Sequence, residues 1–175
     1  RRTNVPVLVW VYGGGFYSGT STLDVYDYRI FADNQDVIVV APHYRVANLG
    51  FMYMGTPDVP GNTGLFDQVL AFQWIKDNID RFGGNPNNIT LMGESAGATG
   101  ISMHLLSPLS RNLFSQAIMQ SGAATVPWGI ISKEENQLRG QRLAEAVGCP
   151  TDLNAVREVI DCLRRVNASD LVNNE

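Results

Sequence analysis

The chain has 175 residues, of which 45% are hydrophobic and 17% charged, with a formal net charge of −4 at pH 7. This length can bury a substantial core, and the acidic balance argues against nucleic-acid binding. No run of about 18 apolar residues occurs, so no membrane-spanning helix is expected. We expect residues 1–175 to be an internal portion of one larger domain, because the chain enters a strand almost at once and Asn173–Glu175 contains no structural terminator.

Apolar runs alternate with helical patterns along the chain. We expect buried strands at 6–12, 37–41, 89–92 and 117–120, and helices at 65–82, 134–147 and 152–165. Strands that alternate with helices predict βαβ units, and hence an α/β fold with a mostly parallel central sheet flanked by helices. The pair Gly83-Gly84 marks the end of the first long helix. Residues 16–36 and 43–63 are expected to be long loops, which in such folds build the site.

A G-x-S-x-G motif, Gly93-Glu94-Ser95-Ala96-Gly97, follows one expected strand and precedes a helical run of small residues. This context predicts a nucleophile elbow, in which a serine on a tight strand-to-helix turn exposes its hydroxyl above the sheet. The glycines are required because a Cβ would clash where the strand folds back against the helix. Taken alone, the motif also fits a plain turn.

Upstream, another expected strand ends in Gly13-Gly14-Gly15. A glycine-rich loop at this place supplies backbone N–H groups to the oxyanion hole of an α/β-hydrolase. We expect Gly14 and Gly15 to donate to the developing oxyanion, with Ala96 as a third donor. The alternative is that three glycines merely turn the chain. Together and in this order, the two motifs predict a serine hydrolase with Ser95 as its nucleophile.

Longer stretches around both motifs resemble the type-B carboxylesterase/cholinesterase family. The resemblance rests on segments 12–19, 23–27 and 93–97 and extends over nearly the whole chain. Tyr12 and Tyr17 are similar to residues of the acetylcholine-hydrolysing members, whereas general carboxylesterases usually have a His before the three glycines. The resemblance implies a partial α/β-hydrolase domain that hydrolyses acetylcholine through an acyl-enzyme on the elbow serine, without a cofactor or a metal.

The resemblance also implies substrate-binding roles for four residues. Glu94 would place negative charge near a quaternary ammonium, and Trp128 would bound the acyl pocket. Tyr17 and Tyr26 match tyrosines of the substrate gorge, and aromatic faces attract quaternary ammonium by cation–π interaction. The plainer alternatives are a hydrogen bond to a neighbouring loop for the glutamate, a core position for the tryptophan and surface packing for the tyrosines.

The two histidines of the chain do not fit as the base for Ser95. His104 comes nine residues later on the same expected helix, which is about 900° of rotation and roughly 13 Å along the axis. His43 follows an expected strand, in a loop. The order of the triad in the family is Ser, acid, His, which implies that the acid and the base lie beyond residue 175.

Cys149 and Cys162 are the only cysteines in the sequence, and the family has a short-loop disulfide at the matching place. The resemblance therefore implies a disulfide and an oxidising compartment, and two unpaired core thiols are the alternative. Zinc binding is not expected, because no His or further Cys lies nearby. Of two glycosylation sequons, the one at Asn167 is favoured over the one at Asn88, which runs straight into a strand.

For the full-length protein the resemblance implies a secreted or synaptic cell-surface location and a small choline ester as substrate, while oligomeric and membrane-anchored forms stay open. Two other functions compete with this hypothesis. One is a broad-specificity type-B carboxylesterase. The other is a cholinesterase-like adhesion or binding protein that has lost its nucleophile, and the intact elbow around Ser95 argues against it.

Overall fold

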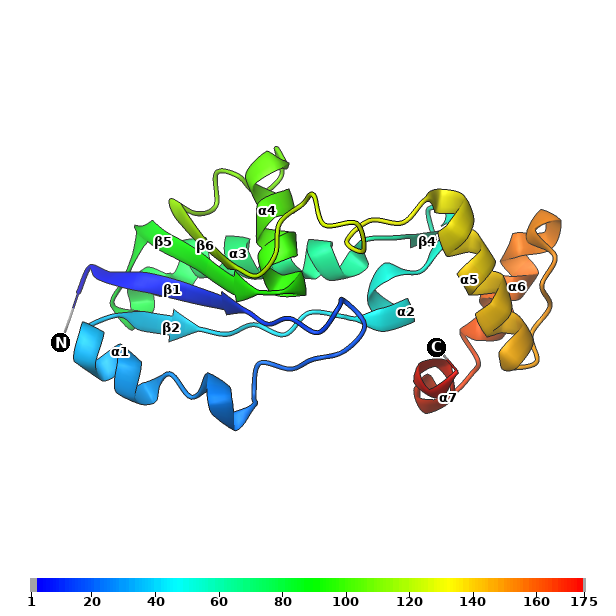
Figure 1. The fold of residues 1–175 in the computed structure, drawn as a ribbon, viewed down its shortest axis with the longest axis horizontal. Helices are drawn as coiled ribbons and strands as arrows, with labels where there is room; N and C mark the ends of the chain where they lie inside the picture. The colour runs from blue at the N-terminus through cyan, green and yellow to red at the C-terminus, as the bar shows by residue number, and fades with distance from the viewer. Residues whose placement is uncertain (1–2, 175) are drawn as a thin grey trace. The chain divides into compact units, whose positions relative to one another are not determined.

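The structure is a computed structural model, and it describes residues 3–174. The chain divides into two compact units. One consists of Arg1–Tyr44 and Leu65–Gly129, and the other of Arg45–Gly64 and Ile130–Glu175. The first unit contains a parallel sheet, and the second is mainly helical with a small hairpin (Figure 1). The expectation that residues 1–175 belong to one larger domain stays a prediction.

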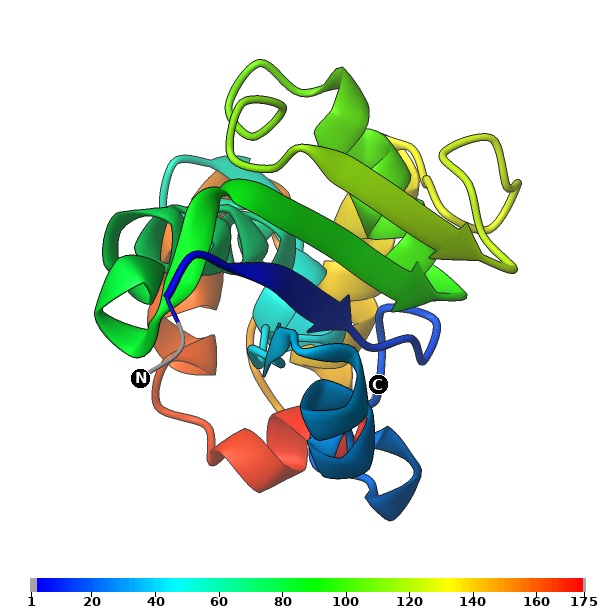
Figure 2. The ribbon, with the colours of Figure 1, turned by 90° about the vertical axis from the view of Figure 1, so that its left-hand side faces the viewer.

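The first unit is built on a four-stranded parallel sheet in the order β2-β1-β5-β6. Its strands are β1 (Val5–Val11), β2 (Ile38–Val40), β5 (Gly84–Glu94) and β6 (Gln116–Gln120). Each strand overlaps the apolar run that predicted it, although β5 begins five residues before its run and β6 is largely exposed. Since all four strands run the same way, their carboxyl ends meet at one edge of the sheet (Figure 2). The α/β class expected from the sequence is therefore confirmed.

Helices cover both faces of this sheet. They are η1 (Asp24–Tyr26), α1 (Arg29–Gln35), α3 (Thr63–Asn78), η2 (Ile79–Phe82) and α4 (Ala96–Leu106). Helices α3 and α4 pack together on one face, where the rings of Phe72 and His104 meet edge-on with centroids 5.0 Å apart. The η1–α1 segment lies on the other face (Figure 2), and there Tyr26 packs on Trp10 at 4.9 Å between ring centroids. The expected helix end is confirmed, since Gly83 terminates η2 in the left-handed conformation at φ 92°.

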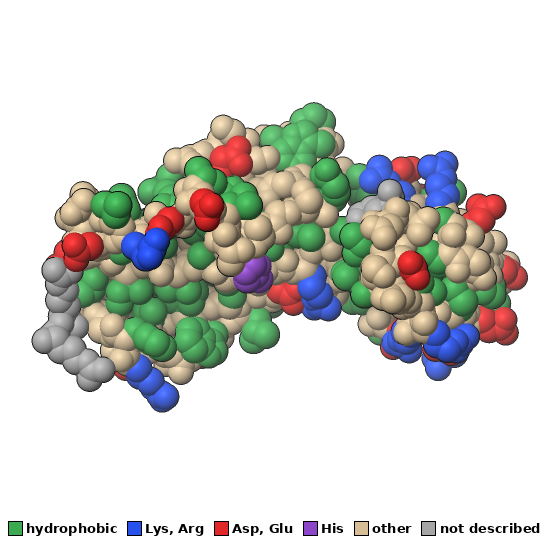
Figure 3. Space-filling model, turned by 90° about the horizontal axis from the view of Figure 1, so that it is seen from below, with side chains coloured by type: hydrophobic (Ala, Val, Ile, Leu, Met, Phe, Trp, Pro, Cys, Tyr) green, Lys and Arg blue, Asp and Glu red, His purple; other side chains and the backbone are tan. Residues whose placement is uncertain are grey.

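The expectation of long loops at 16–36 and 43–63 is wrong. The first range contains η1 and α1, and the second contains α2 (Ala47–Phe51), β3 (Tyr53–Thr56) and β4 (Val59–Pro60). Elements this short do not show a periodic apolar pattern, so they could not be predicted from the sequence. Hydrophobic side chains gather on the face of the first unit that Figure 3 shows. Within residues 23–31, the exposed large ones are Leu23, Val25, Ile30 and Phe31.

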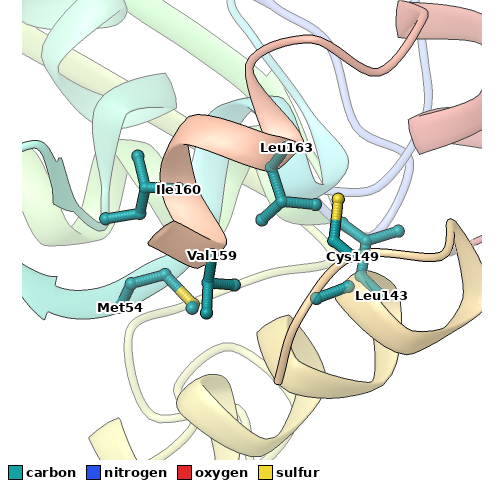
Figure 4. Close-up of a cluster of buried hydrophobic side chains, with 7 residues drawn as sticks. Met54, Leu143, Cys149, Val159, Ile160 and Leu163 are labelled. Carbon is teal, nitrogen blue, oxygen red and sulfur yellow. The ribbon is translucent and has the colours of Figure 1, made fainter. Parts of the chain in front are cut away.

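The second unit packs helices around its own core. The helices are α2, α5 (Lys133–Ala146), η3 (Leu153–Ala155), α6 (Val156–Leu163) and α7 (Ala168–Asn173), beside the antiparallel β3–β4 hairpin. Figure 4 shows the buried cluster at their centre, formed by Met54, Leu143, Ala144, Cys149, Val159, Ile160 and Leu163. A disulfide joins Cys149 to Cys162 with the two Cα atoms 5.7 Å apart. The disulfide implied by the family resemblance is confirmed, and closing so short a loop contributes about 3 kcal/mol in the chain-entropy model.

Candidate active site

Ser95 occupies a strained turn between β5 and α4. It is the N-cap of α4, with φ 54° and ψ −119°. This conformation is costly for a residue with a side chain and persists only where the surroundings impose it. The surroundings do so here, because the Ser95 N–H donates to the Gln120 carbonyl at 2.9 Å and the Ser95 carbonyl accepts from the Thr99 N–H at 2.9 Å. The backbone geometry is that of the nucleophile elbow predicted from the motif.

The glycines on either side of Ser95 are required by close backbone contacts. A Cβ on Gly93 would lie 2.7 Å from the Gly97 carbonyl carbon, and a Cβ on Gly97 would overlap the Val11 carbonyl oxygen. A third glycine, Gly122, is required for the same reason, because its Cβ would overlap the Ser95 carbonyl oxygen. It lies just after β6, at the same sheet edge as the elbow, and no role for it was predicted from the sequence. The strand and helix thus approach too closely for any side chain at these positions.

The glycine loop lies directly against the elbow. A Cβ on Gly13 would lie 3.0 Å from the Ser95 Cβ and 2.6 Å from the Glu94 carbonyl oxygen. Gly14 and Gly15 both have positive φ, at 122° and 64°. The Gly14 carbonyl accepts from the N–H groups of Tyr17 and Ser18 at 3.1 and 3.0 Å, which closes the loop into a tight turn.

The structure therefore brings the two motifs together. Ala96, the third expected donor, is the first residue of α4 and is fully buried. That the N–H groups of Gly14, Gly15 and Ala96 converge on one point stays a prediction.

Two of the expected substrate-binding residues, Glu94 and Trp128, contact the glycine loop or the residue that follows it. A Cβ on Gly13 would be 2.9 Å from Glu94 Oε2, so this carboxylate contacts the start of the loop. The half-exposed ring of Trp128 packs on Phe16, the residue after the three glycines, with centroids 6.4 Å apart. Phe16 itself has a strained backbone with φ 65°.

The two tyrosines expected to bind substrate have different surroundings. Tyr17 is 66% exposed beside the loop. Tyr26 is half-buried in η1, where its ring packs against Trp10. Packing of this kind matches the plainer alternative for Tyr26, and a substrate-binding role for either residue stays a prediction.

Both histidines are hydrogen-bonded to residues other than Ser95, His104 through both ring nitrogens and His43 through Nε2. In buried His104, Nε2 lies 2.9 Å from Gln68 Oε1 and Nδ1 lies 2.9 Å from Ser110 Oγ. Burial lowers the pKa of His104 to about 4, so this imidazole is neutral near pH 7. His43 Nε2 lies 3.0 Å from Ser21 Oγ. These partners agree with the prediction that neither histidine is the base for Ser95.

The two sequons differ in exposure. Asn88 lies half-buried within β5, whereas Asn167 is an exposed residue at the start of α7, and its Oδ1 accepts from the Ser169 N–H at 3.2 Å. Glycosylation at either site stays a prediction.

Across residues 3–174, no group of three or more His, Cys, Asp or Glu side chains is placed to hold a metal ion. Within the same range, no helix is both long and apolar enough to cross a membrane.

A parallel sheet flanked by helices, with a serine on a strained turn at the carboxyl end of a strand, defines the α/β-hydrolase class. The model of the Carboxylesterase family matches residues 1–175. The chain belongs to this family.

Several named relatives are about half identical to the chain. Cholinesterase 1 of Branchiostoma lanceolatum is 48% identical over 173 residues, which cover 99% of this chain and 48% of that protein. Acetylcholinesterase of Electrophorus electricus is 50% identical over 176 residues, which cover 100% of this chain and 28% of that protein. Acetylcholinesterase of Danio rerio is 49% identical over 176 residues, which cover 100% of this chain and 27% of that protein. The chain therefore spans about half, or just over a quarter, of the length of these relatives.

Proposed function

We propose that the full-length protein is a serine esterase that hydrolyses a choline ester, with acetylcholine as the expected substrate, through an acyl-enzyme on Ser95. The observation that carries this proposal is the contact between the glycine loop and the strained elbow. It supports the proposal because acyl transfer requires a nucleophilic serine beside backbone N–H donors, and a glycine-rich loop is the usual source of those donors. The names of the relatives, cholinesterase and acetylcholinesterase, support the choice of a choline ester.

The reaction begins with attack of Ser95 Oγ on the ester carbonyl carbon. A serine hydroxyl needs a base to take its proton, and we expect a histidine outside residues 1–175, because His43 and His104 are engaged elsewhere. The carbonyl oxygen becomes an oxyanion that the N–H groups of Gly14, Gly15 and Ala96 stabilise. Each such donor contributes roughly 3 kcal/mol to the transition state. The choline alkoxide leaves with the proton held by the base, and water then hydrolyses the acetyl-serine ester.

Substrate selection follows from the side chains around the loop. Glu94 supplies negative charge close to Gly13, and the exposed face of Tyr17 is available to a quaternary ammonium. Trp128, held against Phe16, limits the acyl group to a small one. The disulfide in the second unit agrees with a secreted or extracellular location.

The test compares two substrates in the full-length protein. One is acetylthiocholine and the other is its uncharged isostere, in which a tert-butyl group replaces the trimethylammonium. We expect kcat/KM to favour the cation by about tenfold, as cation–π and charge attraction allow. Ser95→Ala should abolish turnover of both, whereas Ser115→Ala, which removes a hydroxyl that donates to the Asn87 carbonyl, should not. Equal kcat/KM for the two esters would favour a broad carboxylesterase, and Ser95-independent turnover would overturn the proposal.

A further inference from the structure

Two buried tyrosines stack at the base of the glycine loop. Tyr12 directly follows β1, and Tyr44 follows β2, the neighbouring strand in the sheet. Their rings are nearly parallel, with an interplanar angle of 15° and centroids 4.4 Å apart. Only 2% of Tyr12 and 6% of Tyr44 are exposed. The carboxyl ends of two parallel strands therefore bring the tyrosines together just before the three glycines begin.

Three hydrogen bonds connect the pair in both directions. The Tyr12 hydroxyl donates to the Tyr44 carbonyl at 2.8 Å and accepts from the Tyr44 N–H at 3.2 Å. The Tyr44 hydroxyl donates to the Tyr12 carbonyl at 2.7 Å. Burial raises the pKa of both hydroxyls above their ordinary value, so both stay protonated and able to donate throughout the pH range of an esterase assay.

The Tyr12 carbonyl belongs to the peptide that leads into Gly13, so the bond from Tyr44 fixes the first peptide plane of the loop. The same carbonyl oxygen would lie 2.8 Å from a Cβ on Gly97, just after the elbow. The Tyr12 ring supports the far end of the loop, since its Cδ2 would lie 2.7 Å from a Cβ on Gly19. Consecutive glycines have wide conformational freedom, and a donor group is effective in catalysis only when it is already oriented.

We propose that Tyr44 is a positioning residue for the oxyanion hole. Its hydroxyl holds the peptide between Tyr12 and Gly13, and through that peptide it orients the N–H groups of Gly14 and Gly15 toward Ser95. This inference rests on the proposed function. The alternative is that the tyrosine pair only stabilises the fold. The two hypotheses differ in which tyrosine, when replaced by Phe, causes the larger loss of activity.

The two tyrosines can be separated because they make different numbers of bonds. Tyr12→Phe removes two hydrogen bonds but leaves the Tyr12 carbonyl held by the other hydroxyl. Tyr44→Phe removes one hydrogen bond, the one that holds the loop. A purely structural pair predicts the larger loss of both stability and activity for Tyr12→Phe. If Tyr44 positions the loop, Tyr12→Phe should lose more stability, whereas Tyr44→Phe should lose more activity.

The experiment measures kcat and KM for acetylthiocholine in full-length wild type and both variants, at a temperature well below their unfolding midpoints. It also measures binding of a trifluoromethyl ketone, which forms an oxyanionic adduct with the serine, and of tetramethylammonium, which does not. We expect Tyr44→Phe to lower kcat and the affinity for the ketone together, by about tenfold, and to leave KM and the affinity for tetramethylammonium within about twofold of wild type.

Ser110→Ala is the matched control, because Ser110 is also buried and hydrogen-bonded, to His104, but lies away from the loop. It should lower stability without changing kcat.

If Tyr44→Phe lowers only stability, as Ser110→Ala should, or if kcat falls more in Tyr12→Phe than in Tyr44→Phe, the positioning role is wrong. If Tyr44→Phe does not fold, the kcat and ketone affinity of Tyr12→Phe decide: a tenfold fall in either overturns the proposal, and values within about twofold of wild type support it. Failure of the proposed function is distinct, because wild type would then show no Ser95-dependent turnover.

Discussion

Gly13 and Ser95 touch across two neighbouring strands, so closely that a Cβ on Gly13 would lie 3.0 Å from the Ser95 Cβ. The sheet register explains the contact. Val11 of β1 is paired with Gly93 of β5, and each of the two motif residues comes two positions later in its strand direction. Parallel pairing therefore delivers the glycine loop and the elbow to the same point, although they are far apart in the sequence.

Gly97→Ala should disrupt this arrangement. Its Cβ would overlap the Val11 carbonyl oxygen and lie 2.8 Å from the Tyr12 carbonyl oxygen, and neither backbone atom can move without shifting β1. We expect the free energy of unfolding to fall by about 2–3 kcal/mol, as for overpacking in a core, and esterase activity to be lost. Urea denaturation of the full-length protein measures the first effect.

Gly148→Ala is the control for this change, since nothing lies within 4 Å of the Gly148 Cβ position and its only obstacle is a positive φ of 74°. It should cost only about 1 kcal/mol from backbone strain. Equal losses at the two glycines would show that the elbow is not closely packed in solution.

Trp128→Ala should weaken the preference for small acyl groups. If the ring that packs on Phe16 bounds the acyl pocket, wild type prefers acetyl over butyryl thiocholine, and removing the ring narrows the ratio of kcat/KM by about tenfold, the discrimination a hydrophobic pocket gives per methylene or two. Trp74→Ala is the control, because Trp74 on α3 has a similar exposure, 51% against 47%, and packs on Phe82 instead. An unchanged ratio in Trp128→Ala would place the acyl pocket elsewhere.

The stability of the protein should fall in acid because of His104. Its pKa is lowered to about 4 in the folded state by burial, whereas an unfolded histidine titrates near 6.5. Between these values the unfolded chain binds a proton that the folded chain does not, so the stabilisation is complete above about pH 6.5 and is lost as the pH falls toward 4. The linked loss amounts to about 3 kcal/mol.

His104→Gln removes the titrating group and serves as the comparison. Urea unfolding at a series of pH values between 7.5 and 4.5 should show a flatter dependence in the variant than in wild type. The same slope in both proteins would mean that His104 is not buried and neutral in the folded state.

The strands and the long helix could be predicted because their apolar patterns are set by burial. Val5–Val11 is covered on both faces and so reads as a continuous apolar run. The elbow could be predicted because a side chain at its glycine positions would clash with nearby backbone, so the glycines themselves mark the turn. The hairpin of β3 and β4 could not, since each strand has at most four residues and is held by contacts from distant segments, such as the bond from the Tyr53 N–H to Asn136 Oδ1.

The hydrogen-bond partners of individual side chains also could not be predicted from the sequence. His104 could be recognised as a poor base from its helical position, but not as a neighbour of Gln68, which is 36 residues away. The same holds for Tyr44, whose hydroxyl reaches the Tyr12 carbonyl across 32 residues. A mostly parallel sheet could be predicted, yet which side chains touch at its carboxyl edge depends on register and rotamer, which a single sequence does not specify.

Covalent labelling of Ser95 tests the central claim most directly. The full-length protein is treated with a fluorophosphonate, digested, and mapped by mass spectrometry, with Ser95→Ala treated in parallel. The account predicts stoichiometric modification of Ser95 alone, in step with loss of esterase activity, because only a serine at an elbow beside an oxyanion hole is activated for such attack. Full inactivation with Ser95 unmodified, or labelling of another serine at the same rate in both proteins, would contradict it.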